Sequence, residues 1–165
     1  MESSSSAGPG GAELPGETLE TLQEATRVLA GVALRSLDVL DGTVTLPQFR
    51  MLSVLADLGR ARSVQVARAL GLEASTVTRL AGRLVGGGYV IRGSEPGHRG
   101  VVTLELTAAG RDLVSQVAAW RERELARILR QLPPAGRVQV TTALRQLVEA
   151  AGEGYGTISR GLVPV

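Results

Sequence analysis

The chain has no cysteine and no lysine, and His98 is the only histidine among its 165 residues. Without a thiol the chain forms no disulfide and cannot sense oxidants through a reactive cysteine. Imidazole and thiolate are the usual protein ligands of transition metals, so such a site would need carboxylates alone or ligands from two subunits. We therefore expect neither a bound metal nor another cofactor.

Aromatic residues and long apolar runs are also scarce. Aromatic side chains make up 2% of the sequence although 44% of it is hydrophobic, which favours helices packed through Leu, Val and Ala. No segment approaches the roughly 20 apolar residues of a membrane-spanning helix, so we expect a cytoplasmic protein without membrane contact. The chain also has no phosphate-binding loop and no histidine-centred triad, and we expect no enzymatic activity.

Positive charge is concentrated in one part of the chain. Residues 60–99 hold seven arginines against Glu73 and Glu95, a balance of +5, whereas the whole chain carries +2. A local excess of cations is typical of a nucleic-acid-binding surface. Every cation is an arginine, however, and a GC-rich genome produces the same bias, so arginine content alone does not establish the function.

The segment from Ser63 to Leu84 has the pattern of a helix-turn-helix. In its first half Val66, Ala67 and Leu70 share one helical face, and Gly71 follows as a left-handed stop. In its second half apolar residues recur at i, i+3, i+4 and i+7: Val77, Leu80, Ala81 and Leu84. Ala67 lies four residues before the glycine, where two closely crossing helices need a small side chain. Two amphipathic helices joined at a glycine also occur in proteins that bind no nucleic acid, so the context has to decide.

The polar face of the second helix predicts contacts with DNA. Hydroxyl and guanidinium groups read base edges and phosphates in a major groove. The residues that carry them on this face are Ser75, Thr76, Thr78, Arg79 and Arg83. Ser63 is predicted to cap the first helix, and Ser63 and Gln65 are secondary candidates for phosphate contacts. The alternative interpretation is a solvated helix face.

A β-hairpin is predicted directly after the helix-turn-helix. Residues 89–92 and 101–106 are rich in β-forming side chains, and residues 93–100 between them are dense in turn residues. Alternation along the second strand places Val102, Leu104 and Leu106 on one face and Val101, Thr103 and Glu105 on the other. A helix-turn-helix followed by a hairpin is a winged helix. The candidate DNA contacts on the hairpin are Arg92, His98 and Arg99.

Short motifs flank this unit: residues 46–49 read LPQF and residues 106–110 read LTAAG. Together with the helix-turn-helix and the arginine-bearing wing, they resemble the MarR family of bacterial transcriptional regulators over residues 17–151. The resemblance implies a homodimeric winged-helix protein that binds double-stranded DNA at a pseudo-palindromic operator. In such wings an acidic residue usually precedes the arginine, whereas here His98 precedes Arg99, and Glu95 is the candidate replacement.

Long helices are predicted on both sides of the winged helix, over residues 17–40, 107–132 and 135–151. They carry more apolar surface than one small domain can cover, which predicts homodimerisation through the first and last helices. A two-fold dimer would place its two recognition helices in successive major grooves, about 10 bp apart.

The predicted fold is mainly α with a small β-hairpin wing. The predicted division is a disordered tail at 1–16, a dimerisation helix at 17–44, a winged helix-turn-helix DNA-binding domain at 45–106, dimerisation helices at 107–151 and a C-terminal tail at 152–165. The first sixteen residues are rich in Ser, Gly and Pro and have neither a basic start nor an apolar core, so they do not resemble a signal peptide.

The expected function is repression of a nearby promoter, relieved by a small anionic or aromatic effector. The resemblance implies an effector crevice between the dimer helices and the DNA-binding lobe. The candidates to line it are Arg35, Phe49, Arg50 and Trp120. Trp120 is alternatively a core or interface anchor, and the two arginines are alternatively surface residues. The alternative function is a winged-helix dimer that contacts other proteins, or a regulator without ligand control.

Overall fold

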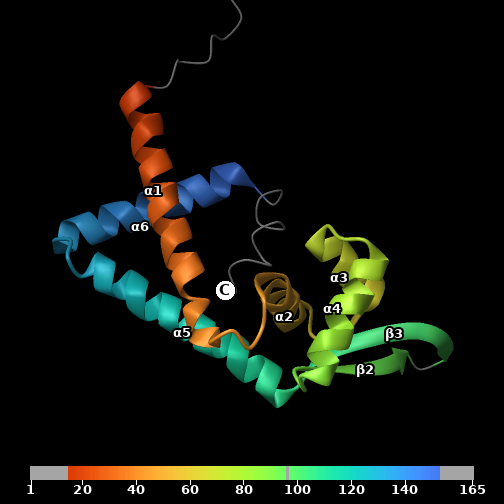
Figure 1. The fold of residues 1–165 in the computed structure, drawn as a ribbon. Coiled ribbons are helices and arrows are strands. Elements are labelled where there is room, and N and C mark those ends of the chain that lie inside the picture. The colour runs from red at the N-terminus through yellow and green to blue at the C-terminus, as the bar shows by residue number, and fades with distance from the viewer. Residues whose placement is uncertain (1–14, 96, 153–165) are drawn as a thin grey trace, which may run out of the picture. The chain divides into compact units, whose positions relative to one another are not determined.

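Figure 1 shows the fold in a computed structural model, which describes residues 15–95 and 97–152, with the backbone alone for residues 98 and 99. The described part is mainly helical with a small antiparallel sheet, as predicted. Contacts divide the chain into two compact units, with the boundary between Gly31 and Val32. The elements in chain order are α1 (Gly16–Arg35), the 3₁₀ helix η1 (Asp38–Leu40), α2 (Leu46–Leu58), β1 (Ala61–Arg62), α3 (Ser63–Leu70), α4 (Ala74–Gly86), β2 (Val90–Glu95), β3 (His98–Leu106), α5 (Ala108–Leu129) and α6 (Pro134–Ala151).

The predicted tails at 1–16 and 152–165 lie almost wholly outside the described residues. Within the part of the chain that the structure describes, no helix is both long and apolar enough to cross a membrane.

The predicted single helix over residues 17–40 was wrong, because α1 ends five residues earlier. The hydroxyl of Ser36 donates to the carbonyl oxygen of Ala33 at 2.6 Å. In a continuing α-helix that carbonyl would accept from the N–H of Leu37. The Leu37 N–H instead bonds the carbonyl of Leu34 at 3.0 Å, and the tighter turn leads into η1.

The core of the winged-helix lobe is built around α2. The helix begins where the side chain of Gln48 reaches back and accepts from the N–H and hydroxyl of Thr45, at 2.7 and 2.9 Å. Pro47 lies in the first turn, where its missing N–H costs nothing. Five consecutive residues from Met51 to Leu55 are buried, as is Phe49. α2 is therefore surrounded by the rest of the lobe and supplies its centre.

The helix-turn-helix forms as predicted. Ala67 is 7% exposed and Val77 is fully buried, so α3 and α4 cross closely. Gly71 takes the left-handed conformation (φ 65°), which other residues adopt only with strain. The N–H of the next residue, Leu72, bonds back to the carbonyl of Ala67 at 3.0 Å and closes the end of α3.

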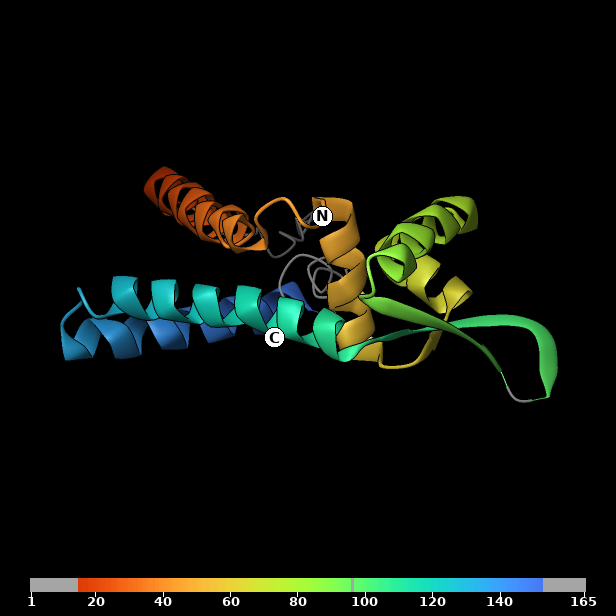
Figure 2. The same ribbon diagram turned by 60° about the horizontal axis from the view of Figure 1, so that its bottom comes forward.

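The wing contains one strand more than the sequence predicted. The short β1 pairs with β3, and the sheet order is β1-β3-β2, antiparallel throughout. Figure 2 shows the β2–β3 hairpin extending away from the helices. At the start of β3 the more apolar face is not the more buried one, because Thr103 is 6% exposed and Val102 is 45% exposed. Thr103 is covered from the side of β1, where the guanidinium of Arg60 donates to its hydroxyl at 3.3 Å.

The junction between the wing and α5 is held by Thr107. Its hydroxyl accepts from the N–H of Gly110 at 3.1 Å, and so caps α5, and it donates to the carbonyl of Gly88 at 2.7 Å. Its own N–H bonds the carbonyl of Tyr89 at 3.0 Å. The end of α4, the start of β2 and the start of α5 are therefore tied at one residue.

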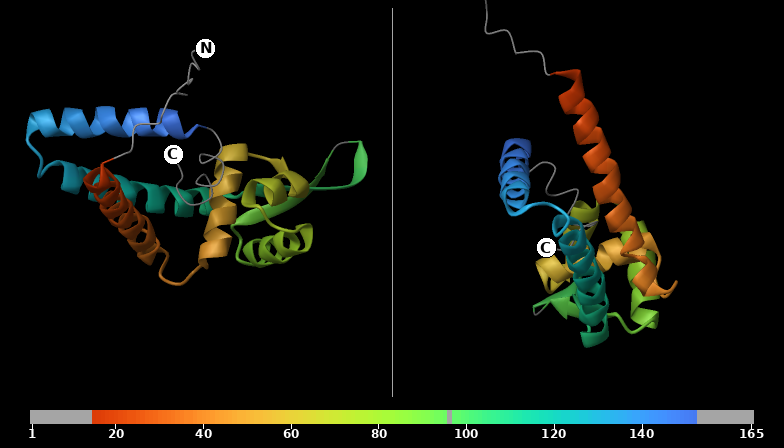
Figure 3. Two further views of the ribbon diagram at one scale, coloured as in Figure 1. Left: turned by 90° about the horizontal axis from the view of Figure 1, so that it is seen from above. Right: turned by 90° about the vertical axis from the view of Figure 1, so that its left-hand side faces the viewer.

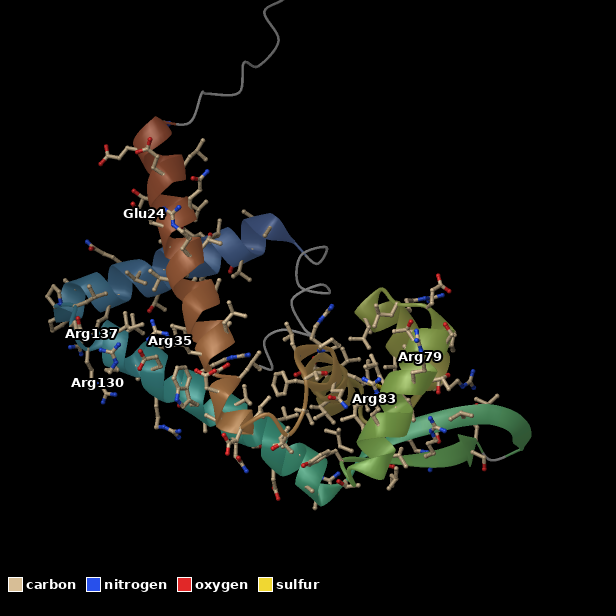
Figure 4. The ribbon with its side chains drawn as sticks, viewed as in Figure 1. Glu24, Arg35, Arg79, Arg83, Arg130 and Arg137 are labelled. Carbon is tan, nitrogen blue, oxygen red and sulfur yellow. The ribbon has the colours of Figure 1, made fainter. Side chains whose placement is uncertain are left out.

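At its far end α5 stops near Pro133, and α6 turns back (Figures 2 and 3). Arg137 secures this corner. Its Nε donates to the carbonyls of Leu129 and Leu132, at 3.1 and 3.0 Å, and its Nη2 donates to that of Arg130 at 3.1 Å. Figure 4 shows Arg130 and Arg137 at the turn. These bonds occupy carbonyl groups that the end of a helix leaves without partners.

Gly110→Ala is expected to lower the free energy of unfolding by about 1–3 kcal/mol, the usual cost of overpacking. A Cβ at this position would collide with the backbone carbonyl of Tyr89, which cannot move without breaking the Thr107 junction. Gly136→Ala on α6 is the matched control, because its Cβ would meet Pro133 at 3.5 Å and Leu132 at 3.7 Å, both ordinary contacts. Urea denaturation measures both, and equal stabilities of the two variants would contradict the junction.

Candidate functional site

The outward face of α4 is polar, as its sequence predicts. Ser75, Thr78, Arg79 and Arg83 are exposed, whereas Thr76 is half-buried. Figure 4 shows Arg79 and Arg83 on successive turns of this helix. The guanidinium of Arg79 donates to the hydroxyl of Thr76 at 3.3 Å. The hydroxyl of Thr78 donates to the carbonyl of Ala74, one turn earlier in α4. α4 thus presents two guanidiniums and several hydroxyls to its surroundings.

The start of α3 differs from the prediction that Ser63 caps it. Arg62 occupies the N-cap position with an extended backbone, and its N–H donates to the side-chain oxygen of Gln65 at 2.9 Å. Ser63 is the first helical residue, and its hydroxyl donates to the carbonyl of Val102 on β3 at 3.3 Å. Both candidate side chains therefore have a role within the chain: Gln65 caps α3, and Ser63 links it to the wing.

Arg92, a candidate DNA contact, joins the wing to α4. Its Nη2 donates to the backbone carbonyl of Thr78 on α4 at 3.0 Å. The guanidinium passes over Gly82, where a Cβ would lie 3.6 Å from Nη2. Arg92 remains exposed, so it lies at the surface where α4 and β2 meet.

Two further arginines, Arg60 and Arg62, hold the wing from the side of β1, whereas the sequence left open whether they neutralise the DNA backbone or have no role. The Nη2 of Arg60 donates to the carbonyl of Ser94 at 2.9 Å. The Nη2 of Arg62 pairs with Oε1 of Glu95 at 2.6 Å, and this hydrogen-bonded pair raises the pKa of the Arg62 guanidinium. Only the extra strand β1 could have pointed to this arrangement, and at two residues it is too short to leave a pattern in the sequence.

The tip of the wing is described by its backbone alone. Gly97 has φ 81°, a conformation that favours glycine in a tight turn. The side chains of His98 and Arg99, both candidate DNA contacts, lie outside the described residues.

A groove of about 380 Å³ lies between the start of α3, α4 and the wing. Three candidate DNA contacts, Ser63, Thr78 and Arg92, line it together with Arg62, Val101 and Val102. Residues far apart in the sequence are thus brought to one surface, which combines the exposed part of α4 with the stem of the wing.

The four candidates for an effector crevice have different environments. Phe49 is fully buried, whereas Arg35 is exposed and Arg50 and Trp120 are partly exposed. Arg35 lies near Glu124 on α5, whose carboxyl has its pKa lowered by a hydrogen bond from Arg127 and, more weakly, by the charge of Arg35. The Nε of Arg50 is buried without a hydrogen-bond partner. Phe49 therefore contributes to the core of this chain and not to an open pocket.

Sequence reasoning missed Arg121, a buried arginine beside these residues. It is 6% exposed and lies on α5. Its Nε donates to the hydroxyl of Ser36 at 2.7 Å, its Nη2 reaches the carbonyl of Ala33 at 3.5 Å, and its Nη1 has no partner. The guanidinium lies 6.0 Å from the centre of the Phe49 ring.

No carboxylate within the described part of the chain forms an ion pair with Arg121. Burial consequently lowers the pKa of its guanidinium. Arg121 follows Val114 by seven residues and Val117 by four, so helical spacing puts it on the buried face of α5, and this is the signal that could have found it. In the same described part, no cluster of His, Asp or Glu side chains could hold a metal ion.

Comparisons with known proteins identify relatives of this fold. A sequence model of the MarR family matches residues 43–99. RV1404 from Mycobacterium tuberculosis, a crystal structure, is 36% identical, with 88% of this chain and 100% of that chain covered and a TM-score of 0.79. A MarR family protein from Bacillus stearothermophilus is 26% identical, with 82% and 96% covered and a TM-score of 0.68.

The same fold occurs in FabT from Streptococcus pneumoniae, whose structure was solved in complex with DNA. It is 18% identical, with 82% of this chain and 98% of that chain covered and a TM-score of 0.68. A comparison with curated proteins gives no match.

Arg121→Met is expected to leave the free energy of unfolding unchanged or to raise it by up to about 4 kcal/mol. The variant keeps most of the buried volume and removes a charge that no carboxylate balances. Arg121→Ala is the comparison, because it removes the same charge but leaves a cavity and should cost about 2 kcal/mol or more. Chemical denaturation distinguishes them, and equal losses would mean that the bonds to Ser36 and Ala33 outweigh the cost of burying the charge.

Proposed function

Since this chain belongs to the MarR family, we propose that it is a DNA-binding transcriptional regulator that represses a nearby promoter as a homodimer. The observation that carries the proposal is the outward face of α4, which exposes hydroxyls and guanidiniums beside a wing while its apolar face is completely covered. A regulator of this kind acts on the chromosome in the cytoplasm.

In this proposal α4 enters the major groove. Arg79 reads a guanine edge, since a guanidinium can donate two parallel hydrogen bonds to the oxygen and nitrogen of that base. Arg83 and the nearby hydroxyls of α4 contact base edges or phosphates. Ser63, Gln65 and Arg92 contact the phosphates of the DNA backbone beside the major groove. The wing carries His98 and Arg99 to the phosphates or the minor groove.

Dimerisation is supported by the apolar surface of the outer helices. No residue of α6 is buried, even though several are apolar. Four large apolar side chains are between 41% and 70% exposed: Val138, Leu144, Leu147 and Val148. In α1, considered by itself, Leu19, Leu22, Val28 and Leu29 are between 40% and 54% exposed. A second copy that covered these faces would remove their apolar surface from water and pair two recognition helices on a pseudo-palindrome.

An anionic effector is supported by the buried Arg121. A buried guanidinium with an unpartnered Nη1 is costly unless a negative group compensates it. We propose that a small aromatic acid takes this role, with its carboxylate on Arg121 and its ring near Trp120 and Arg50. Binding there would favour a dimer geometry that does not fit the operator.

Arg79→Ala is expected to lower affinity for the operator by about 1–3 kcal/mol and to relax the preference at one base pair. The wild-type protein should bind with a slope of log affinity against log salt of about −0.9 for each phosphate contacted. Fluorescence anisotropy with the DNA upstream of the gene, compared with an unrelated duplex, measures both quantities.

Two variants serve as references for this experiment. Arg123→Ala removes an exposed arginine of α5 and should leave the affinity unchanged, whereas Arg99→Ala should weaken binding to every sequence alike. Weak binding of the wild type that does not depend on sequence, after selection from a genomic library as well, would favour a winged-helix module that contacts proteins.

Benzoate is expected to weaken operator binding by the wild-type protein by about fivefold or more, a coupling of roughly 1 kcal/mol. Arg121→Met should bind DNA normally and should not respond, because it lacks the positive charge. Benzamide, which has the same ring without the negative charge, is the matched ligand control. If a series of aromatic acids leaves the affinity unchanged, ligand control is wrong for this regulator.

A further inference from the structure

The stem of the wing is fastened on both of its faces by arginine side chains. On one face Arg92 donates to the carbonyl of Thr78 on α4 at 3.0 Å. On the other face the guanidinium of Arg60 covers Gly93, where a Cβ would lie 3.2 Å from Nη2. Successive residues of a strand face opposite sides, so these two arginines hold the sheet from opposite directions.

Beyond these contacts, β2 ends at Glu95, whose side chain forms an ion pair just before the hairpin turns. Oε1 of Glu95 lies 2.6 Å from Nη2 of Arg62. The strand register shifts between Ser94 and Glu95, and Glu95 is paired with His98. A register shift of this kind bends the strand locally, so the direction of the hairpin beyond it is set at this point.

The backbone of Arg62 is held in place on two sides. Its backbone pairs with Thr103 of β3, and its N–H donates to the side chain of Gln65 at the start of α3. The ion pair therefore joins the outer end of β2 to the first turn of the helix-turn-helix, from which the hairpin projects.

We propose that Glu95 is a positioning residue for the wing. Its ion pair with Arg62 fixes the direction in which the hairpin leaves the sheet, and thereby where the wing meets DNA. The inference rests on the DNA binding proposed above. It explains why an acidic side chain stands on a surface otherwise rich in arginine, where it repels phosphates.

The pair is too exposed to support the fold as a whole. The side chains of Arg62 and Glu95 are 48% and 26% exposed, and ion pairs at the surface contribute about 0–1 kcal/mol to folding. Loss of the pair is therefore expected to leave the melting temperature nearly unchanged. Its effect should be seen in the wing and in the binding of DNA.

The decisive variant is Glu95→Gln, because the loss of a negative charge and the loss of wing positioning would change the affinity for DNA in opposite directions. Removing a negative charge near the phosphates would by itself strengthen binding. If Glu95 positions the wing, affinity for the operator instead falls about fivefold, the equivalent of roughly 1 kcal/mol. Binding as tight as or tighter than that of the wild type would overturn the proposal.

Glu73→Gln is the matched control. Glu73 is the other acid of the basic segment, is exposed at the N-cap of α4, forms no side-chain cap bond and has no ion pair among the described residues. Its loss changes the net charge equally, and it should bind DNA at least as tightly as the wild type.

Hydrogen exchange tests the positioning without DNA. Backbone amides of residues 97–102 are expected to exchange faster in Glu95→Gln and in Arg62→Glu than in the wild type. The double variant with Arg62→Glu and Glu95→Arg restores the ion pair at unchanged net charge, and it should recover most of the protection. Equal exchange in all four proteins would show that the pair does not order the wing.

The two measurements separate the two proposals. A wild-type protein that binds no DNA, combined with faster exchange in Glu95→Gln, would reject the function and retain the positioning role. If the wild-type protein binds its operator and Glu95→Gln shows unchanged affinity and exchange, the proposed function is retained and the positioning role is rejected.

Discussion

The close crossing of α3 over α4 is the constraint on which the DNA-binding surface depends. Ala67 has no side chain beyond Cβ, and Gly71 turns the chain in the left-handed conformation, so Val77 and Leu84 can be buried completely. Because the apolar face of α4 is buried against the rest of the lobe, only its polar face is exposed at the surface. A larger residue at Ala67 would separate the helices and rotate Arg79 away from its direction.

The parts of the fold that the sequence predicts are those specified by neighbouring residues. The helix-turn-helix and the hairpin each follow from patterns within a few turns of chain, and they form as expected. The errors occur where a distant side chain intervenes. α1 ends early at Ser36, whose hydroxyl is held by a guanidinium 85 positions away. The burial of Thr103, whose hydroxyl accepts from Arg60, 43 positions earlier, is likewise invisible in the local pattern.

The candidate site shows the same division. Exposure of Ser75, Thr78, Arg79 and Arg83 follows from helical periodicity, and the structure agrees with it. Periodicity cannot show that a cation has a partner inside the chain, so the charge balance of residues 60–99 treats all seven arginines alike. Arg60, Arg62 and Arg92 are bonded to the wing or to α4. Net charge marks the segment that holds α4 and the wing, but it does not reveal that these three guanidiniums are already bonded within the chain.

Among the described residues, most hydrogen bonds from arginine side chains end on the main chain and not on another side chain. Arg60 and Arg92 donate to the carbonyls of Ser94 and Thr78, and Arg111 donates to that of Leu106. Every residue type supplies a carbonyl, so the acceptor positions are free to change identity during evolution without loss of the bond. Correlated substitutions between the two positions are then not required. In an alignment of relatives, the only trace of such a hydrogen bond would be conservation of the arginine. Methods that infer contacts from correlated substitutions would therefore miss the hydrogen bonds that hold this wing.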